Sequence, residues 1–281
     1  MKDMKRREDR RPVRDMGRRR PVRDEERRFE GDEEANENQI EGRNALTEAL
    51  RSGRTIDKVF IAAGETDRAL QRLAADAKEA GAVVVPVDRR KLDFMSQSHS
   101  HQGVIALVAA REYCTIDDIL AEAESRGEQP LIVICDELSD PHNLGAILRT
   151  AECAGAHGVI IPKRRSVGLT AVVAKASAGA IEHMKVARVT NMNATIEELK
   201  EKGVFIVAAD MGGQPAAQID FDMPCAIVIG AEGSGVSEGV RKAADLIVSI
   251  PQKGNINSLN ASNAAAILLY EAVRQRLGLE G

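Results

Sequence analysis

Six polar side chains crowd the start of the last expected helix, where one capping residue would be enough. The helix is expected over 264–276, and the crowded residues are Asn255, Asn257, Ser258, Asn260, Ser262 and Asn263. Asn and Ser side chains compete with the helical backbone for hydrogen bonds, so such a cluster opposes local helix stability. We therefore expect that part of this cluster binds a polar ligand, and that the segment 250–271 is central to function.

A second polar segment follows the apolar run 131–135, which is expected to be a buried strand. Asp140 and the proline after it predict a turn, and Asn143 is a candidate N-cap for the helix expected over 144–154. Gly145 has no side chain, so it would let this helix approach another element closely.

Arg149 falls in the second turn of that helix, among Leu, Ala and Ile residues. Two interpretations are open. The guanidinium could contact a phosphate or a ribose at the carboxyl end of the preceding strand. Alternatively, it could extend into solvent or pair with Glu152.

The third segment, 227–237, is a strand followed by a glycine-rich turn. The spacing of Gly230, Gly233 and Gly235 matches neither the dinucleotide fingerprint nor a P-loop, and no Lys follows. Glu232 inside the turn is more informative, because a carboxylate repels phosphate and attracts cations or hydroxyl donors. The alternative is that Glu232 is an ordinary exposed turn residue.

Apolar runs alternate with helical patterns along the chain, which predicts an α/β fold. In the first part, strands are expected at 58–62, 83–87 and 103–109, and helices at 42–52, 67–80 and 90–95. In the second part, strands are expected at 131–135, 159–161, 185–189, 204–208, 226–229 and 246–250, and helices at 144–154, 169–180, 194–202 and 238–243. Short apolar strands separated by helices predict a mostly parallel sheet with both faces covered. Ligands bind such sheets beyond the carboxyl ends of the strands.

The character of the chain changes at three places. We expect a small α/β domain over 38–110, a linker over 111–129 and a second α/β domain over 130–281. Within the linker, Thr115 begins a capping box for a short acidic helix.

An arm over 1–37 precedes these domains. Residues 1–28 carry thirteen Lys and Arg against seven Asp and Glu, with almost no apolar periodicity, so we expect disorder. The arm either binds RNA phosphates or is a solvated extension without a specific partner.

Read in order, the three segments resemble the motifs of the SpoU family of S-adenosylmethionine-dependent RNA ribose 2′-O-methyltransferases. The matching residues are Asp140-Pro-x-Asn-x-Gly-x-x-x-Arg149, Gly230-x-Glu-Gly-x-Gly235 and Ile250-Pro-x-x-Gly-x-x-x-Ser-Leu-Asn-x-Ser262. The resemblance covers about 38–278 and is greatest to members that methylate a guanosine of bacterial 23S rRNA. Two positions depart from the usual pattern, since Gln252 stands where Met is common and Asn263 where a small apolar residue is usual.

This resemblance implies a fold, a cofactor and roles for individual residues. The fold is a C-terminal α/β trefoil-knot methyltransferase domain preceded by a ribosomal-protein-L30e-like domain that binds the RNA substrate. The cofactor, S-adenosylmethionine, would be held largely by main-chain groups at Gly230, Ile250 and Leu259. The catalytic positions would be Arg149, Glu232, Asn143, Ser258 and Asn260. The group that accepts the proton of the 2′-hydroxyl is open, with Glu232 chemically easier than an arginine whose pKa exceeds about 12.

The expected partners are 23S rRNA and a second copy of the chain in a homodimer, with no metal and no membrane. The four cysteines and five histidines show no metal-ligand spacing, and no apolar run reaches the length of a membrane span. The charged N-terminus contains no secretory signal, so we expect a cytoplasmic protein. Aromatic residues form only 2 % of the chain, so recognition should depend on RNA shape and phosphates more than on base stacking.

Three other hypotheses are kept. The substrate could be a tRNA or another rRNA site. The chain could be an RNA-binding assembly factor that has lost catalysis. The glycine-rich turn alone would also fit a Rossmann-type nucleotide enzyme.

Overall fold

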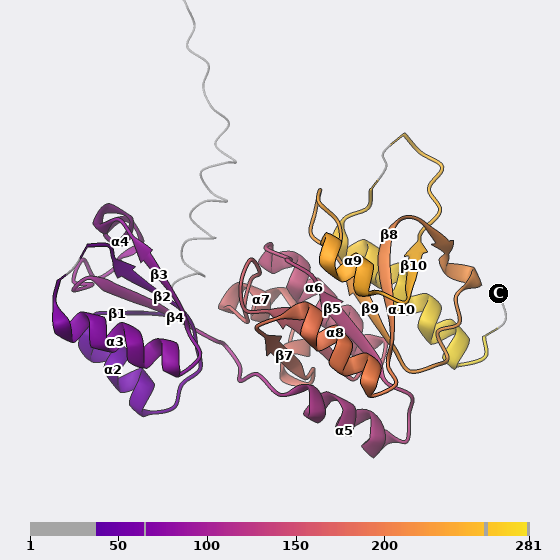
Figure 1. The fold of residues 1–281 in the computed structure, drawn as a ribbon, viewed down its shortest axis with the longest axis horizontal. Helices are drawn as coiled ribbons and strands as arrows, with labels where there is room; N and C mark the ends of the chain where they lie inside the picture. The colour runs from indigo at the N-terminus through magenta and orange to yellow at the C-terminus, as the bar shows by residue number, and fades with distance from the viewer. Residues whose placement is uncertain (1–37, 65, 256–257, 280–281) are drawn as a thin grey trace, which may run out of the picture.

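The structure, a computed structural model, describes residues 38–64, 66–255 and 258–279, which form two α/β domains (Figure 1). The arm expected over 1–37 lies outside the described residues, as does Asn257. Each domain has its own sheet, and the α/β class expected from the alternating pattern is confirmed.

The N-terminal domain has a four-stranded sheet in the order β1-β4-β2-β3. Only β2 and β3 run parallel; β4 is antiparallel to both of its neighbours. The strands are β1 (Gln39–Glu41), β2 (Ile56–Ala62), β3 (Val83–Val87) and β4 (Val104–Val108), and the helices are α2 (Arg43–Arg51), α3 (Arg68–Glu79) and α4 (Arg89–Met95). Helices α2 and α3 pack their apolar stripes on one face of the sheet, whereas Leu92 of α4 packs on the other with Ile105.

The second domain has a six-stranded sheet in the order β10-β8-β9-β5-β6-β7, and every neighbouring pair is parallel. Its strands are β5 (Leu131–Cys135), β6 (Gly158–Pro162), β7 (Val186–Val189), β8 (Phe205–Pro215), β9 (Cys225–Ile229) and β10 (Leu246–Ser249). Its helices are α5 (Ile116–Arg126), α6 (Pro141–Cys153), α7 (Ala171–Ala176), α8 (Met192–Glu201), α9 (Glu238–Ala243) and α10 (Ala261–Arg276), with short 3₁₀ turns η1 (Ala180–Glu182) and η2 (Ala216–Gln218).

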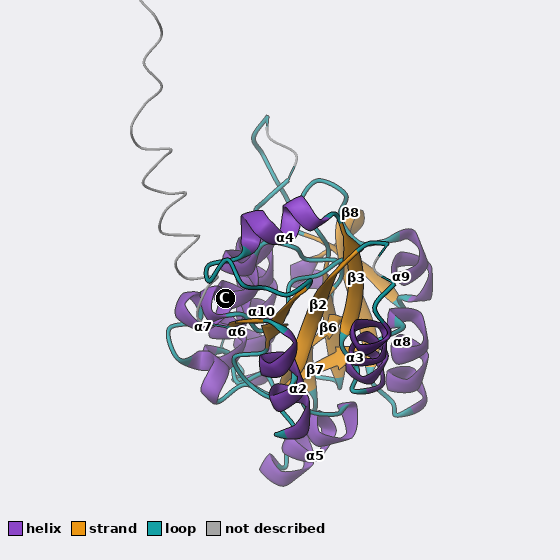
Figure 2. Cartoon of the chain, turned by 90° about the vertical axis from the view of Figure 1, so that its left-hand side faces the viewer, coloured by secondary structure: helices purple, strands orange, loops and turns teal. Residues whose placement is uncertain are grey.

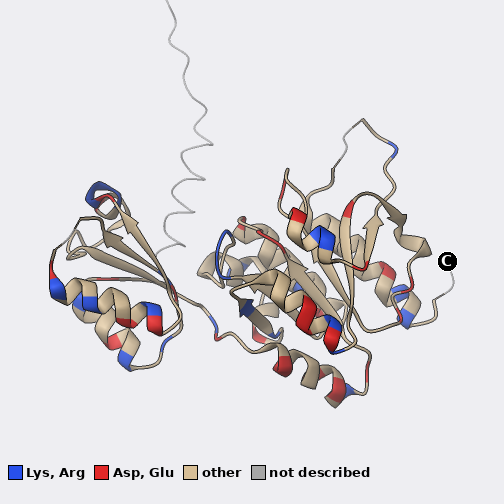
Figure 3. Cartoon of the chain, in the orientation of Figure 1, with Lys and Arg blue, Asp and Glu red and all other residues tan. Residues whose placement is uncertain are grey.

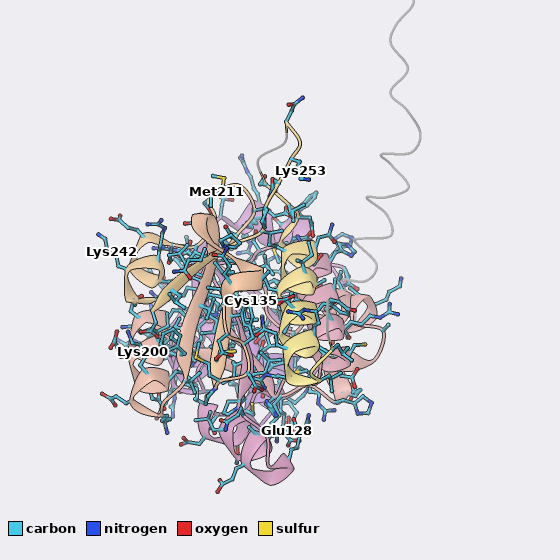
Figure 4. All side chains as sticks on the ribbon, turned by 90° about the vertical axis from the view of Figure 1, so that its right-hand side faces the viewer. Glu128, Cys135, Lys200, Met211, Lys242 and Lys253 are labelled. Atoms are coloured by element: carbon cyan, nitrogen blue, oxygen red, sulfur yellow. The ribbon has the colours of Figure 1, made fainter. Side chains whose placement is uncertain are left out.

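Alternate residues of β5 show how the two faces of this sheet are covered. Leu131 and Val133 share a core with α6, α7 and α10, whereas Ile132 and Ile134 share one with α5, α8 and α9. Figures 2 and 4 show these helices on opposite sides of the strands. Burial on both faces explains why β5 is a continuous apolar run.

Helix α5 belongs to this packing, although the sequence places it in the linker. Thr115 forms the expected capping box with Asp118. The side chain of Ile119 is fully buried in the core that also contains Ile132 and Ile160. The connection between the domains is therefore shorter than the expected linker, because α5 packs as part of the second domain.

The strands of the second sheet all point their carboxyl ends to one edge. Figure 4 shows Met211 and Lys253 at this edge, at the end of the domain opposite Glu128. After β10, at one side of the sheet, the chain returns along α10 to pack against α6 and β9 near the centre. This return path includes the segment where the resemblance implies a knot.

Two expected elements differ from the structure. The helix expected over 169–180 is interrupted, because Ala178 (φ 49°) and Gly179 (φ 92°) adopt left-handed backbone angles. Strand β8 was expected to end at residue 208 but continues to Pro215, through polar residues and glycines that carry no strand pattern. No helix in the described ranges is both long and apolar enough to cross a membrane.

Candidate functional site

Three connections at the carboxyl edge of the second sheet bring the three sequence segments together. One joins β5 to α6, the second is the glycine-rich turn after β9, and the third joins β10 to α10. Strands β9 and β5 are direct neighbours, and α10 packs against α6. Residues more than a hundred positions apart in the sequence are therefore adjacent here.

Side chains from the three segments form one hydrogen-bonded cluster. Asn143 donates from Nδ2 to Glu232 Oε1 over 2.7 Å. Asn260 donates from Nδ2 to the same carboxylate oxygen over 2.8 Å and to Asn143 Oδ1 over 2.9 Å. The other Glu232 oxygen, Oε2, accepts no hydrogen bond from the described residues. The cluster thus fixes the orientation of the Glu232 carboxylate and leaves Oε2 available.

The position of Asn143 corrects one sequence expectation. The N-cap of α6 is Asp140, whose side chain accepts a hydrogen bond from the backbone of His142, and proline occupies the first helical turn. Asn143 is already inside the helix, and only 4 % of its surface is exposed. Because Asp140 caps the helix, the Asn143 amide is free to bind Glu232.

Asn260 has two functions at once. Its Oδ1 accepts hydrogen bonds from the backbone of Ser262 (3.0 Å) and Asn263 (3.3 Å), which makes it the N-cap of α10. Its Nδ2 reaches the cluster. Ser262 contributes a further hydrogen bond to the cap, so one of the crowded side chains is the cap and a second supports it.

Glycine geometry shapes the turn that carries Glu232. A Cβ at Gly230 would overlap the backbone of Gly235, and the turn is closed by reciprocal backbone hydrogen bonds between Ala231 and Gly235. Asp136, which the sequence reasoning missed, accepts a 2.7 Å hydrogen bond from the backbone of Ser237 and is only 3 % exposed. The sequence did contain a signal for Asp136, because a carboxylate directly after a buried strand is expected at the ligand-binding edge of a parallel sheet.

A cavity of about 210 Å³ opens beside this turn. All three residues expected to hold the cofactor line it, namely Gly230, Ile250 and Leu259. Glu232 and Ser258 also line it. The sequence reasoning missed Asp210 and Met211 in the extended part of β8, which form another wall. Asp210 is tied to Arg241 by a 2.7 Å ion pair.

Arg149 lies apart from this cavity. It is on α6 but does not line the cavity wall, and its side chain is exposed to solvent. Neither the expected alternative partner Glu152 nor any other described residue forms a hydrogen bond or ion pair with it. The structure therefore places Arg149 on the same helix as Asn143 but outside the cavity lining, and no described residue bonds to its guanidinium.

The chemistry of the site does not include a thiolate. Cys135 ends β5 beneath the cluster, and burial, reinforced by the charge of Asp136, raises the pKa of its thiol to about 12. Groups of His, Cys, Asp and Glu that could hold a metal ion are also absent from the described part of the chain. The polar groups at the cavity are amides, hydroxyls, carboxylates and backbone atoms.

Comparison with known proteins identifies the family. The profile of the SpoU rRNA Methylase family matches residues 130–270, and the profile for RNA 2′-O ribose methyltransferase substrate binding matches residues 39–114. A Bacillus subtilis protein, YacO, whose name assigns it to the TrmH family of tRNA/rRNA methyltransferases, is 48 % identical over 236 residues, which cover 84 % of this chain and 94 % of that protein.

Solved structures agree with this. The SpoU methyltransferase AviRb from Streptomyces viridochromogenes, crystallised with AdoMet, has a TM-score of 0.55 and 25 % identity, covering 85 % of this chain and 90 % of that one. An AdoMet-bound rRNA methyltransferase from Sinorhizobium meliloti has a TM-score of 0.52 and 26 % identity, covering 86 % and 88 %. With the motif residues gathered at one edge of the sheet, the chain belongs to the SpoU rRNA methylase family.

Proposed function

We propose that this protein transfers the methyl group of S-adenosylmethionine to the ribose 2′-hydroxyl of a guanosine in 23S rRNA. The observation that carries the proposal is the cluster of Asn143, Glu232 and Asn260 at the mouth of a cavity lined by Gly230, Ile250 and Leu259. Side chains from separate motifs hold Glu232 through Oε1 and leave Oε2 without a hydrogen bond from the described residues, which supports a role for that second oxygen in the reaction.

The cavity suits S-adenosylmethionine chemically. Its wall combines apolar side chains, including Ile250 and Leu259, with exposed backbone of the Gly230–Gly235 turn. Apolar surface suits the adenine ring, and backbone groups suit its edge and the ribose. The Glu232 carboxylate favours a ligand with positive charge, which both the sulfonium and the amino group supply, whereas the Asp210 carboxylate is already paired with Arg241.

The bound cofactor supplies an activated methyl group with a neutral leaving group, so the remaining difficulty lies with the ribose hydroxyl. Aligning the hydroxyl with the methyl group can contribute about 7–11 kcal/mol to lowering the barrier. We assign Ser258 and Glu232, which both line the cavity, to orient that hydroxyl, and the Glu232 carboxylate to accept its proton.

Arg149 has the role of binding the RNA. An exposed guanidinium that no described residue pairs with can bind a phosphate in bidentate geometry. Asn143 and Asn260 act by holding Glu232 and the start of α10, as their hydrogen bonds indicate.

We assign 38–110 to RNA substrate binding and 130–281 to methyl transfer, and the segment 111–129 between them contributes α5 to the second domain. The first assignment is supported by the match of 39–114 to a substrate-binding family. A dedicated domain for RNA favours a large, structured rRNA over a small tRNA substrate, and the cytoplasm is where such a substrate is found.

We also propose a homodimer. An apolar hollow of about 800 Å³ lies between α6 and α10, lined by residues that include Thr150, Pro251 and Tyr270. Ile267 and Tyr270 are 43 % and 66 % exposed, whereas Leu268 and Leu269 beside them are buried. A second copy covering the hollow would place its surface next to Arg149 and to the loop after β10.

The activity is tested by incubating the protein with labelled S-adenosylmethionine and unmodified 23S rRNA or tRNA. We expect label on one ribose of 23S rRNA, which blocks alkaline cleavage at that position. Label on a base, or on tRNA only, contradicts the substrate. RNA binding without label in any RNA favours the assembly-factor alternative, and binding of NAD or ATP in calorimetry favours the nucleotide-enzyme alternative.

The dimer is tested by light scattering and by mixing two inactive variants, Arg149→Ala and Glu232→Gln. If Arg149 of one protomer serves the cavity of the other, the mixture recovers part of the activity because some sites contain both intact residues. A monomer at micromolar concentration overturns the dimer.

A further inference from the structure

A second cavity, between the two domains, lies outside the site described above. Its volume is about 420 Å³, and it is lined on one side by the end of α3 and the start of β3, and on the other by residues that follow β6 and β7. Its charged lining residues are Lys78, Lys163 and Arg164, and no carboxylate lines it. We call it the interdomain cleft.

The three cations of the interdomain cleft have no acidic partner. None of them forms an ion pair with a described residue, although exposed Asp76 and Glu79 belong to the same helix as Lys78. The Lys163 ammonium lies close to Gly81, 3.6 Å from where a Cβ on that glycine would be. Gathering three like charges is unfavourable without a counter-charge, so the cleft is suited to an anion.

The walls of the cleft are held together by a buried ion pair. Arg188 of β7 donates to Asp57 Oδ1 over 2.6 Å, and the side chains are 6 % and 7 % exposed. Arg188 also donates to the Lys163 carbonyl, and Tyr113 donates to Asp57 Oδ2 over 3.1 Å. Because Asp57 belongs to the N-terminal domain and Arg188 to the second, this network joins the two domains beside the cleft.

The cleft is connected to the catalytic edge of the sheet. The basic residues after β6 lie on the side of the second domain that faces the first (Figure 3). In the same loop, Ser166 and Val167 both donate to the Leu138 carbonyl, each over 2.9 Å. Leu138 belongs to the loop that leads into α6, which carries Asn143 and Arg149. An anion in the cleft would therefore lie at the same edge as the reacting ribose.

We propose that the interdomain cleft binds the phosphodiester backbone of the RNA next to the modified nucleotide. Unpaired cations without any aromatic neighbour in the lining contact phosphates, and such contacts position a nucleic acid without reading its sequence. The proposal rests on the proposed function because it requires an RNA substrate. It does not depend on which RNA is methylated.

The test uses the full chain and compares two double variants that each remove two positive charges. Lys163→Gln with Arg164→Gln changes the cleft. Lys202→Gln with Lys242→Gln is the matched control, because these lysines pair with Asp117 and Glu238 and do not line the cleft. Fluorescence anisotropy measures the affinity for a 23S rRNA fragment and for tRNA at several salt concentrations.

We expect the cleft variant to bind RNA about tenfold or more weakly near physiological salt and to reduce the slope of log K against log salt by about 1.4 to 1.8. S-adenosylmethionine affinity should be unchanged, and methylation should show a higher KM for RNA with kcat retained. A salt slope equal to that of the control overturns the proposal, whatever methylation activity is found.

A milder pair of variants protects this test against misfolding. Thr190 lines the cleft and is exposed, so Thr190→Glu adds a carboxylate without removing any contact of the buried ion pair, and Thr190→Gln is its neutral match. Weaker RNA binding by Thr190→Glu, with Thr190→Gln unchanged, supports an anion site. Equal RNA binding by the two variants overturns it.

Discussion

Glu41 in the N-terminal domain and Glu232 in the second domain each gather hydrogen-bond donors from distant parts of the chain. Glu41 uses both of its oxygens. Oε1 accepts from Gln39 and Gln97, and Oε2 accepts from Ser96 and from both the backbone and hydroxyl of Ser98. Glu232 uses Oε1 alone, for two amides.

Under the proposed function, this difference separates a structural carboxylate from a reactive one. Apart from Gln39 of β1 itself, the donors to Glu41 follow α4, at residues 96–98, so its charge holds this segment on β1 and both of its oxygens are occupied. Burial raises the pKa of Glu41, but the hydrogen bonds outweigh burial and lower it from 4.5 to about 2. Glu232 is also oriented by hydrogen bonds, yet its Oε2 accepts none from the described residues, and the residue lines a cavity. The two proposed roles are distinguished by saturation, that is, by whether both carboxylate oxygens accept hydrogen bonds from the protein, more than by charge or motif.

The largest effect is expected from Glu232→Gln. The glutamine oxygen can still accept from Asn143 and Asn260, so the free energy of unfolding should change by less than about 1 kcal/mol. The methyl-transfer rate should fall by about 10²–10⁴-fold if the carboxylate accepts the proton. Single-turnover methylation at saturating RNA measures it, with Glu41→Gln as the control that keeps its rate. A Glu232→Gln rate within threefold of wild type, roughly, would remove Glu232 from the chemistry.

The next effect tests the turn that presents Glu232. Gly230→Ala forces a Cβ into the backbone of Gly235, so we expect a loss of about 3 kcal/mol in unfolding free energy and weaker S-adenosylmethionine binding. Gly233→Ala is the matched control, because Gly233 (φ 83°) has open space around it and should cost about 1 kcal/mol through backbone strain alone. Urea unfolding and calorimetry measure both. Equal costs for the two variants would show that close approach at Gly230 is unimportant.

A smaller effect, dependent on pH, is expected from Glu41→Gln. Since the folded pKa lies below the ordinary value, ionised Glu41 stabilises the fold above about pH 4.5, and this contribution is lost as the pH falls toward 2. Allowing for partial solvent screening, the variant should lose about 2 kcal/mol at neutral pH.

Urea unfolding of Glu41→Gln and wild type at neutral pH and in acid provides the measurement. The two proteins should converge in acid, because protonated Glu41 gives up the same charge that the variant lacks. A stability gap that is independent of pH would mean that the loop depends on the shape of Glu41 and not on its charge.

Much of this site could be predicted, because parallel strands place their carboxyl ends at one edge. The apolar run at 131–135 corresponds to β5 residue for residue, and the runs at 226–229 and 246–250 match β9 and β10 to within one residue, so the segments after these strands had to meet. That Asn143, Glu232 and Asn260 share one oxygen, however, depends on Asp140 taking the cap of α6, a choice between two good capping residues that the local sequence leaves open.

Other features could not be predicted for physical reasons. Strand β1 has three residues, too few to show a pattern, and it exists because β4 offers a partner. Asp57 and Arg188 lie in strands of different domains, 131 positions apart, and neither belongs to a motif. Their pairing follows from how the domains pack, which local periodicity does not encode. The interdomain cleft beside this ion pair could not be predicted for the same reason.

The smallest effect concerns a third carboxylate, Glu137, which has one partner and lies at the surface. Its ion pair with Arg165 spans 2.9 Å, but the two side chains are 36 % and 78 % exposed. Arg165→Gln should therefore change the unfolding free energy by no more than about 0.5 kcal/mol, since solvent screens the pair. Glu137 has a positive φ of 56°, yet hydrogen bonds to the Leu138 carbonyl hold its loop without help from the pair. Thermal unfolding measures the change. A loss above about 2 kcal/mol would show that even a single exposed partner can make a carboxylate structural, and saturation would no longer separate Glu41 from Glu232.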